Sequence, residues 1–436
     1  MTNKEEDFDE YFPVLDDFGC KAYEDLAKSI DEKVYRWIRV EAKEDESLTD
    51  IKTKEDVLSK IRQVREYQES FGPATLYKRE WERRTRSDDK STDSDGGQPV
   101  GSFSALQFNT LAEGLSAGPD VSPPFPIDQQ IEGEKNIGYG GFSELTHPEI
   151  CLDFSLRRWR LLEVILGGDS SSDGSFDLLA LEEVDRFRGF FAPVLRLFGY
   201  EGIFAPKTKS PGVPLGYYSD GCALFWKTSV FELLSEERIQ FKVGNQIIIL
   251  AMLKHVESGV PLLVAATHLK AQKSESSEMI RCRQVKELLG HIEDARVKQT
   301  EMLDTDDIPI IVMGDFNADP PSDTPFSSSS VQRVIFNHKT TCDDNSDIKK
   351  ARLARPMKFQ SAHPIDPPNP NFFTTWKTRG SYTVKRIIDY IFYSEQLTCT
   401  DTLNVPELEE IESTKLPSLR YPSDHLMIAA KFEIRK

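Results

Sequence analysis

Residues 308–320 read Ile-Pro-Ile-Ile-Val-Met-Gly-Asp-Phe-Asn-Ala-Asp-Pro, and this stretch decides the fold class. Residues 308–313 are an apolar run of strand length, and the run ends at a glycine followed by Asp315 and Asn317. A Gly-Asp pair after a strand is often only a turn. Loops at strand ends are also where a rigid sheet presents polar groups, so the stretch equally predicts a strand that carries functional side chains at its end.

The same arrangement recurs at five other apolar runs. The polar residues at their ends are Asn109, Glu183 with Asp185, His268 with Lys270, Asp389, and Asp424 with His425. Each is weak by itself, since His268 could be a core histidine and Asn109 a strand-end cap. Taken together they are hard to explain as turns, because buried carboxylates are costly unless they are paired or bind a metal. One shared cation would offset that cost for several of them.

The spacing of apolar residues predicts the architecture of residues 99–436. Strand-length runs occupy residues 103–108, 176–181, 222–226, 246–253, 261–267, 308–313, 387–393 and 427–432. Residues 156–166 and 280–292 have the longer amphipathic pattern of helices. Strand follows strand too often for an alternating, doubly wound sheet, so we predict an α/β fold in which a mixed two-sheet sandwich is flanked by helices.

The first 86 residues are predicted to form an acidic α-helical extension. Apolar residues from Tyr23 to Ile38, and again from Val57 to Tyr67, recur at helical spacing, and Thr53 with Asp56 resembles a helix start. The stripes predict either packing against the following domain, which we favour, or a protein partner. Residues 78–86 alternate basic and acidic side chains, which favours a solvated helix face over a phosphate-binding patch. Residues 87–98 contain no apolar side chain and predict a flexible linker.

Composition limits the class of protein. The net charge is -18, whereas nucleic-acid-binding proteins are usually basic, so a nucleotide would have to be held by local cations or a metal. No run approaches 18 consecutive apolar residues, which predicts no membrane span. The acidic start lacks the pattern of a signal or transit peptide, and the six cysteines form no CxxC pair. We therefore expect a cytoplasmic protein, with the nucleus as the alternative, that is not secreted.

The ordered motifs QFNTLAEGL, LALEEVD, SDGCALFWK, THLKA, RCRQ, GDFNADP, IDYIFYS and YPSDHL resemble the catalytic domain of the endonuclease/exonuclease/phosphatase superfamily. They cover residues 100–436, and the closest resemblance is to its nocturnin and CCR4-type members. The resemblance implies a DNase I-like fold and Mg²⁺-dependent phosphoester hydrolysis, with Mn²⁺ as a substitute ion. One departure is visible, since this chain has Glu182 where the family usually has Gln.

The resemblance also implies roles for single residues. Glu183 and Asn109 hold the metal, and Asp424 lies close to it. Asp315 and Asn317 position the attacking water and the scissile phosphate, and His268 donates to a phosphate oxygen. His425 pairs with Asp389, and the general base is either Asp315 or His425.

Two substrates remain open under this resemblance. A nocturnin-like enzyme would remove the 2′-phosphate of NADP(H), with Lys270 and Arg379 gripping the dinucleotide, although Gln272 stands where nocturnin has an Arg. A CCR4-type enzyme would shorten poly(A) RNA from its 3′ end. A pseudoenzyme scaffold is a third hypothesis, which the complete set of site residues disfavours.

Overall fold

The computed structural model describes residues 38–84, 98–127, 138–142, 144–168, 176–303, 308–320, 331–336, 357–363, 372–379 and 382–435. The predicted linker at residues 87–98, apart from Gln98, and the apolar stripe from Tyr23, apart from Ile38, lie outside these residues. No helix in the described part is both long enough and apolar enough to cross a membrane.

Two large sheets form the centre of the fold. The first has seven strands in the order β1 (Trp81–Arg83), β14 (Leu397–Leu403), β15 (Ile428–Arg435), β2 (Pro99–Asn109), β3 (Leu178–Val184), β5 (Gly221–Lys227) and β4 (Tyr200–Pro206). The second has six, in the order β10 (Phe359–Ser361), β13 (Asp389–Ser394), β9 (Ile310–Asp315), β8 (Pro261–His268), β7 (Ile247–His255) and β6 (Phe231–Gln240). A separate hairpin pairs β11 (Thr375–Arg379) with β12 (Tyr382–Arg386). Only β2 with β3 and β8 with β9 run parallel, so both sheets are mixed, as predicted.

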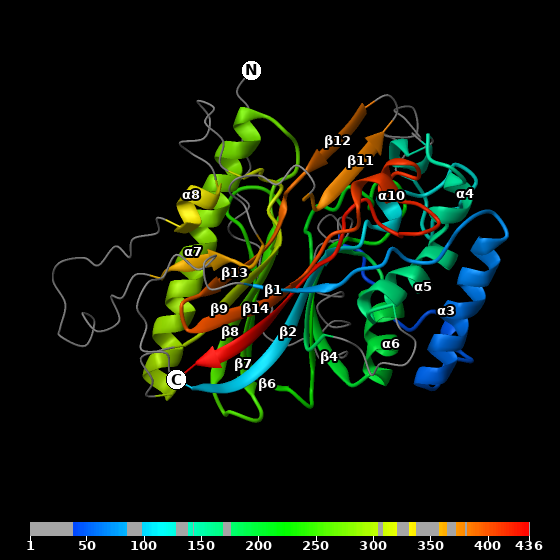
Figure 1. Ribbon diagram of the computed structural model, residues 1–436. Coiled ribbons are helices and arrows are strands. Elements are labelled where there is room, and N and C mark those ends of the chain that lie inside the picture. The colour runs from blue at the N-terminus through cyan, green and yellow to red at the C-terminus, as the bar shows by residue number, and fades with distance from the viewer. Residues whose placement is uncertain are drawn as a thin grey trace, which may run out of the picture.

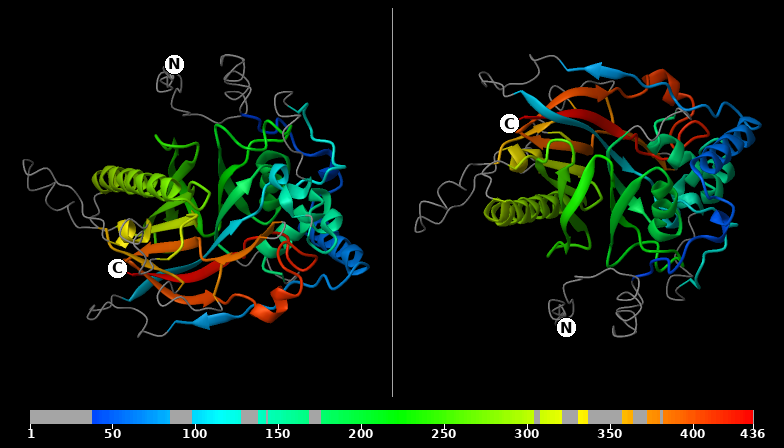
Figure 2. Two further views of the ribbon diagram at one scale, coloured as in Figure 1. Left: turned by 90° about the horizontal axis from the view of Figure 1, so that it is seen from above. Right: turned by 90° about the horizontal axis from the view of Figure 1, so that it is seen from below.

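Helices cover the outer faces of both sheets (Figure 1). On the side of the first sheet lie α3 (Lys54–Glu69), α4 (Pro148–Cys151), α5 (Phe154–Ile165), α6 (Ala192–Leu197) and α10 (Leu408–Glu412). On the side of the second lie α7 (Glu275–Leu303) and α8 (Val331–Phe336). Short helical turns connect these elements: η2 (Glu46–Leu48), η4 (Glu113–Leu115), η5 (Gly138–Gly141) and η6 (Phe187–Phe191). Views along the layers show the same order of helices, sheet, sheet and helices (Figure 2), which confirms the predicted sandwich.

Alternation along the strands decides which residues reach the site. In β2, Phe103 and Ala105 belong to the core between the two sheets, while Leu106 and Phe108 pack against the helices. Successive side chains of a strand point to opposite faces, so Asn109 continues the inward row that begins at Phe103. The strands β8 and β9 repeat the pattern, since Ala266 and Met313 are in the same inner core. The inward rows of three strands therefore end in polar side chains at one end of the sandwich.

The helix α3 packs against the first sheet and its covering helices. It begins at the predicted start, where the Thr53 and Asp56 side chains cap each other's backbone N–H groups. Its apolar face, including Val57 and Ile61, shares one hydrophobic cluster with α5 and the first sheet. The described part of the extension therefore packs against the following domain.

The predicted solvated helix at residues 78–86 is wrong. Trp81–Arg83 instead forms β1 and pairs antiparallel with β14 at the edge of the first sheet. Alternating charges suit an edge strand as well as a helix face, because both expose one side to water. Trp81 packs against the cluster beneath the first sheet, which anchors the strand.

Candidate active site

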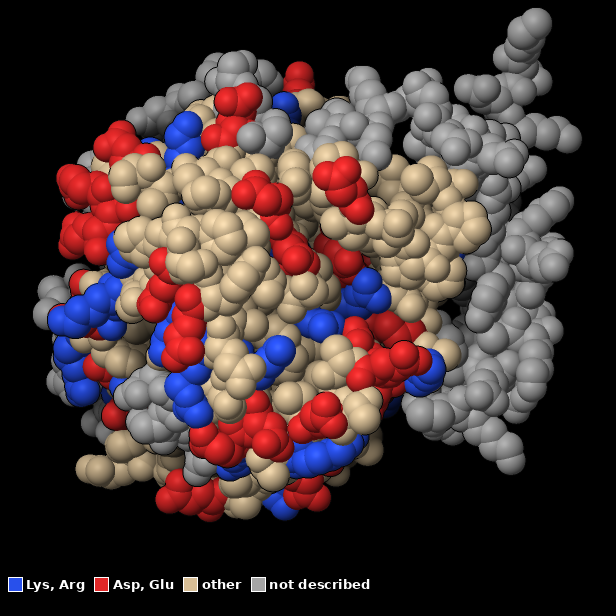
Figure 3. All heavy atoms as spheres, turned by 90° about the vertical axis from the view of Figure 1, so that its right-hand side faces the viewer, with Lys and Arg blue, Asp and Glu red and all other residues tan. Residues whose placement is uncertain are grey.

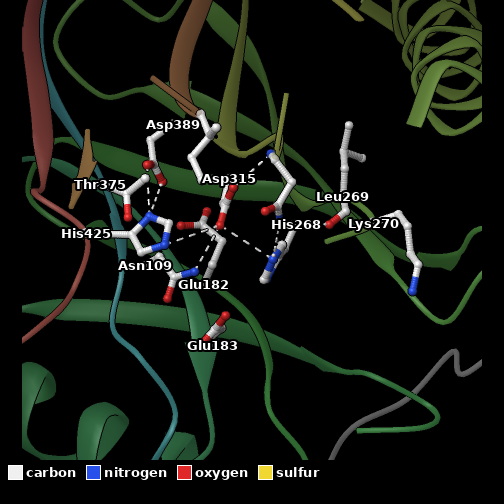
Figure 4. Close-up of polar contacts among 12 residues, drawn as sticks. Asn109, Glu182, Glu183, His268, Leu269, Lys270, Asp315, Thr375, Asp389 and His425 are labelled. Atoms are coloured by element: carbon white, nitrogen blue, oxygen red, sulfur yellow. Dashed lines mark hydrogen bonds and ion pairs between the residues drawn. The ribbon is translucent and has the colours of Figure 1, made fainter. Parts of the chain in front are cut away.

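The polar residues at the ends of β2, β8 and β9 converge on one another (Figure 4). The strands β8 and β9 run parallel, with His268 beside Asp315 in register. Close approach of these two strands requires the glycine of the GDFN motif, because a Cβ at Gly314 would lie 1.9 Å from the Thr267 carbonyl oxygen.

Asp315 lies at the centre of this cluster. Asn109 donates to its Oδ2 atom over 3.1 Å, and the Nε2 atom of His268 lies 3.5 Å from the same oxygen. The other carboxylate oxygen accepts the backbone N–H of Asn317 over 2.9 Å. All four residues are buried. Burial, followed by the negative charge of Asp389, raises the pKa of Asp315 to about 6.

Asn317 fixes the tautomer of His268. Its Nδ2 atom donates to the Leu269 carbonyl oxygen at 3.2 Å, and it lies 3.0 Å from His268 Nε2. Because a carbonyl can only accept, the amide nitrogen faces both partners and Nε2 of His268 accepts. Burial, together with the charge of Lys207, holds the pKa of His268 well below its usual value, so the ring is neutral. The proton therefore sits on Nδ1, which has no hydrogen-bond partner among the described residues and is free to donate.

His425 joins two carboxylates from the opposite side. Its Nδ1 atom lies 2.9 Å from Asp389 Oδ2, and its Nε2 atom lies 3.8 Å from Asp315 Oδ2. Burial lowers the pKa of His425, but Asp389 and Asp315 raise it by more, and the net value is about 9. Ligand atoms of these three residues lie within 4.8 Å of one another, close enough to share a metal ion. A protonated His425 is hydrogen-bonded to Asp389 through Nδ1, while its Nε2 faces Asp315 at 3.8 Å and has no hydrogen-bond partner among the described residues.

Glu182, the departure from the family pattern, lies fully buried behind this cluster. The side-chain amide of Gln107 donates to Glu182 Oε2 at 2.7 Å and to Asp389 Oδ1 at 2.9 Å. Burial, followed by Asp389 and Asp315, raises the pKa of Glu182 well above its usual value. The surroundings of Glu182 therefore disfavour its charged form, and a neutral Gln, which the family usually has here, would avoid that cost.

Glu183 is set apart from Glu182 by a local irregularity. The pairing of β3 with β5 shifts register between Leu181 and Val184, and Glu183 has a φ of 54°. A shift of this kind re-aims side chains, so both neighbouring acids reach the end of the strand. The left-handed conformation is costly for a residue other than glycine, and such strain is concentrated at functional sites.

The residues present fit a divalent cation. Glu183 is half-buried, and within the described residues its carboxylate accepts only one hydrogen bond, a long one of 3.3 Å from the Ala112 N–H. The amide oxygen of Asn109 accepts from Leu111 at 3.0 Å and keeps a second lone pair. Asp424 Oδ2 is buried without a hydrogen-bond partner among the described residues. Hard oxygen ligands of this kind are what Mg²⁺ prefers.

Two lysines enter the site, each held by one acid. Lys377 of β11 lies 3.7 Å from Asp424 Oδ2. Burial raises the pKa of Asp424, but the positive charges of Lys377, His425 and Arg379 lower it by more. The net pKa is below the ordinary value, so this carboxylate is ionised. Lys207, which follows β4, is buried and donates to Asp220 over 2.5 Å. Burial lowers the pKa of Lys207, but Asp220 and Glu183 raise it by more, so it is charged.

Two of the three predicted substrate-binding residues, Lys270 and Arg379, lie outside the hydrogen-bonded cluster, whereas Asn317 belongs to it. Lys270 comes two residues after His268, and among the described residues no ion pair joins it to the cluster (Figure 4). Arg379 ends β11, is exposed, and stacks over the Phe142 ring at 4.6 Å. Its charge contributes to the lowered pKa of Asp424, so it lies at the rim of the same site.

Three residues in or beside the site were not singled out from the sequence: Lys207, Lys377 and Arg157. Nothing in a single sequence shows that the two lysines lie close to the acidic and histidine residues of the site. Arg157 of α5 is fully buried and donates to the carbonyl oxygens of Thr110, Leu111 and Pro422. It thereby ties the loop after Asn109 to the loop before Asp424.

Comparison with known proteins gives a consistent result. Residues 152–425 match the model of the endonuclease/exonuclease/phosphatase family. Nocturnin of Rattus norvegicus is 30% identical over 357 residues, covering 80% of this chain and 69% of that protein. The Ccr4 subunit of Candida glabrata, a 3′-5′-exoribonuclease of the CCR4-Not complex, is 25% identical over 315 residues, covering 66% of this chain and 34% of that protein.

A solved structure extends the similarity to three dimensions. The human Nocturnin catalytic domain with a bound sulfate anion superposes with a TM-score of 0.53 at 25% identity. The match covers 82% of this chain and 97% of that structure. The two sheets and flanking helices described above are thus the fold of that domain.

Proposed function

Because the chain belongs to the endonuclease/exonuclease/phosphatase family, we propose that it is a Mg²⁺-dependent phosphoester hydrolase that converts NADP(H) to NAD(H) by removing the 2′-phosphate. The observation that carries the choice of substrate is the entry of Lys207 and Lys377 into an otherwise acidic site. A terminal phosphate monoester carries nearly two negative charges near neutral pH, whereas an RNA linkage carries one. Two fixed ammonium groups suit the dianion.

Glu183 and Asn109 would hold Mg²⁺, with Asp424 close by. When bound, the ion lowers the pKa of water and neutralises charge on phosphate oxygens. Asp315 is ionised at neutral pH and accepts hydrogen bonds from Asn109 and Asn317, so it is placed to orient the attacking water and take its proton. We therefore favour Asp315 over His425 as the general base.

The two histidines act as donors under this proposal. His425 is protonated near neutral pH and presents Nε2–H on the Asp315 side, where negative charge develops on the phosphoryl oxygens. His268 is neutral, and its Nδ1–H would be the second donor, since it is buried without a hydrogen-bond partner among the described residues. Asp389 holds the His425 ring in place, which fixes its orientation without contacting the substrate.

Lys270 and Arg379 would bind the remaining phosphates of the dinucleotide. Both lie beyond the buried cluster, where the rest of a bound dinucleotide would extend. Gln272 is uncharged where nocturnin has an Arg, so only Lys270 and Arg379 would bind these outer phosphates.

The alternative is a CCR4-type 3′-5′ exoribonuclease acting on poly(A). A long RNA would need a basic track leading from the site. On the face that carries α3, α4 and α5, acidic and basic side chains of the described residues intermingle instead (Figure 3). The net charge of -18 also opposes a polyanion.

The test compares two substrates at matched concentrations. Purified protein with Mg²⁺ is incubated with NADPH or with a 5′-labelled A20 RNA, and released phosphate and RNA length are measured. We expect turnover of NADPH, and its loss in Glu183→Ala at an unchanged melting temperature. Stepwise shortening of A20 without NADPH turnover would replace the proposal with the exoribonuclease, and inactivity toward both would favour a scaffold.

A further inference from the structure

Residues 38–45 form an extended strap along the catalytic fold. One end is fixed near η6, where the Asp45 N–H donates to the Gly189 carbonyl over 2.9 Å and Arg158 pairs with the Asp45 carboxylate at 2.7 Å. In the middle, the buried side chain of Glu41 packs so closely on Gly189 that a Cβ there would lie 3.2 Å away. The strap is therefore held along its length and not only at its ends.

The other end of the strap meets the loop that joins β4 to β5. The backbone of Arg39 forms two hydrogen bonds with Ser219, accepting its N–H over 2.7 Å and donating to its Oγ over 2.9 Å. The Arg39 guanidinium donates to the Val213 carbonyl at 3.1 Å and lies over the Phe125 ring at 4.8 Å. One strap residue thus contacts the loop at two separate points.

The residue after Ser219 is the partner of the active-site lysine. Asp220 receives the Lys207 ammonium on one carboxylate oxygen and the Ser210 hydroxyl on the other. The Lys207 N–H also donates to the Asp220 carbonyl over 2.9 Å. Lys207, Ser210 and Asp220 are buried, yet the loop between them contains no helix or strand. The loop is held by turn-type backbone hydrogen bonds of its own, such as that from the Val213 N–H to the Ser210 carbonyl, and the contacts from the strap add to them.

We propose that Arg39 is a positioning residue for Lys207, so that the segment before the catalytic fold sets the substrate affinity of the active site. The proposal rests on the proposed function in one respect, namely that Lys207 binds the substrate phosphate. A lysine side chain has four rotatable bonds and loses much conformational freedom when it is fixed. Asp220 holds the Lys207 ammonium by an ion pair, and Asp220 itself belongs to the loop that joins β4 to β5. Arg39 of the strap holds that loop through its contacts with Ser219 and Val213.

The first measurement needs neither metal nor nucleotide. Full-length protein is treated with a limiting amount of acetic anhydride, and the acylation of Lys207 is followed by mass spectrometry relative to the exposed Lys78. The amine is protected while it is buried and paired. Arg39→Ala should raise the relative acylation of Lys207 about tenfold, since the lost hydrogen bond and ring contact cost about 1–2 kcal/mol. Arg39→Lys should show a smaller increase.

The second measurement separates positioning from general damage. We expect Arg39→Ala to raise KM for NADPH several-fold with kcat within twofold, because the metal-holding residues do not contact the strap. In a Lys207→Ala background the same change should have no further effect on KM. Lys43→Ala is the matched control, since this strap residue is exposed and, among the described residues, forms an ion pair with Glu46 alone.

The outcomes are distinguishable. Unchanged acylation of Lys207 in Arg39→Ala would overturn the proposal, whatever the kinetics show. Increased acylation with an unchanged KM would also overturn it, because the strap would then hold the lysine without affecting the substrate. If wild-type protein turns over neither NADPH nor A20, the proposed function fails, and the acylation result alone decides whether the strap positions Lys207.

Discussion

Asp315 and Asp389 lie directly opposite each other as a Cα pair across the antiparallel strands β9 and β13. Like charges in that arrangement repel. His425 reaches both carboxylates, 2.9 Å from Asp389 and 3.8 Å from Asp315. The imidazolium therefore compensates two acids that the sheet register forces together.

His425 and Asp389 should act as one unit. We expect His425→Ala and Asp389→Ala each to lower kcat about 10²–10⁴-fold, since each removes the oriented donor. The kcat of the double variant should be only slightly lower than that of either single variant, because the first substitution has already removed the oriented donor. Single-turnover rates on NADPH measure this. Fully multiplicative losses would show that the two side chains act independently.

The pH dependence follows from the two groups on either side of the reacting phosphate. Asp315 must lose its proton to act as base, and its pKa is about 6, so kcat/KM should rise as pH passes that value. His425 must keep its proton to donate, and its pKa is about 9, so the rate should fall above that value. The profile is measured on NADPH at saturating Mg²⁺. If the acid limb persists in Asp315→Asn at reduced rate, another group controls it.

Glu182→Gln should keep the fold and the activity, because burial and the nearby carboxylates of Asp389 and Asp315 already disfavour a charge at this position. The raised pKa means that the fold disfavours the charged form. The free energy of unfolding therefore falls as pH rises above the ordinary value of 4.5, by up to about 1.4 kcal/mol per pH unit. Glu182→Gln has no carboxyl group at this position, so the difference between its melting temperature and that of the wild-type protein should increase as the pH rises. Glu201→Gln, at an exposed site, should show no such trend, and a constant gap for Glu182→Gln would argue against a buried, protonated acid.

The packing of α3 predicts a loss of stability for changes far from the candidate active site. Ile61 is only 5% exposed in the cluster that α3 shares with α5, so Ile61→Ala should lower the free energy of unfolding by about 2–5 kcal/mol. Lys60→Ala, on the exposed face of the same helix, should change it by less than about 0.5 kcal/mol. Denaturant unfolding measures both. Deleting residues 1–98 removes α3 and β1 together, and we expect that truncation to be insoluble.

Arg379 should distinguish the two substrates. A charge-assisted hydrogen bond contributes about 1.5–3 kcal/mol, so Arg379→Ala should lower kcat/KM for NADPH about tenfold to a hundredfold. The loss on A20 should be distinctly smaller. Gln272→Arg should raise the NADPH rate if the missing cation limits binding. Equal losses on both substrates would remove the argument for a dinucleotide.

Much of the architecture could be predicted from the strand-length apolar runs. The runs at residues 103–108, 261–267 and 308–313 became β2, β8 and β9, and the polar residue after each reached the site. The reason is the two-residue period of a strand. Asn109, His268 and Asp315 lie an even number of positions after core residues that face inward, so their side chains face inward too. Strand alternation alone would not predict that Glu183 reaches the site. Its position depends on a register shift between Leu181 and Val184 that cannot be recognised in the sequence.

The residues that escaped prediction depend on tertiary contacts. Lys207 follows a strand, β4, that lacks a clean apolar run, and its role depends on Asp220 thirteen positions later. The strand β1 has only three residues and depends on its antiparallel pairing with β14 at the edge of the first sheet. Its alternating charges fit a helix equally well, so local sequence could not decide.

The place of β15 in the first sheet has a consequence for protein synthesis. It lies between β14 and β2, and pairs Ile428 with Gln107. At translation rates of about 5–20 residues per second, β2 emerges from the ribosome on the order of 15–60 s before its neighbour exists. During that interval one edge of an apolar strand has no partner, which invites mispairing with other nascent chains. Cells that make this protein should therefore need a chaperone to hold β2 until the strand that closes the sheet, and the histidine just before it, have been translated.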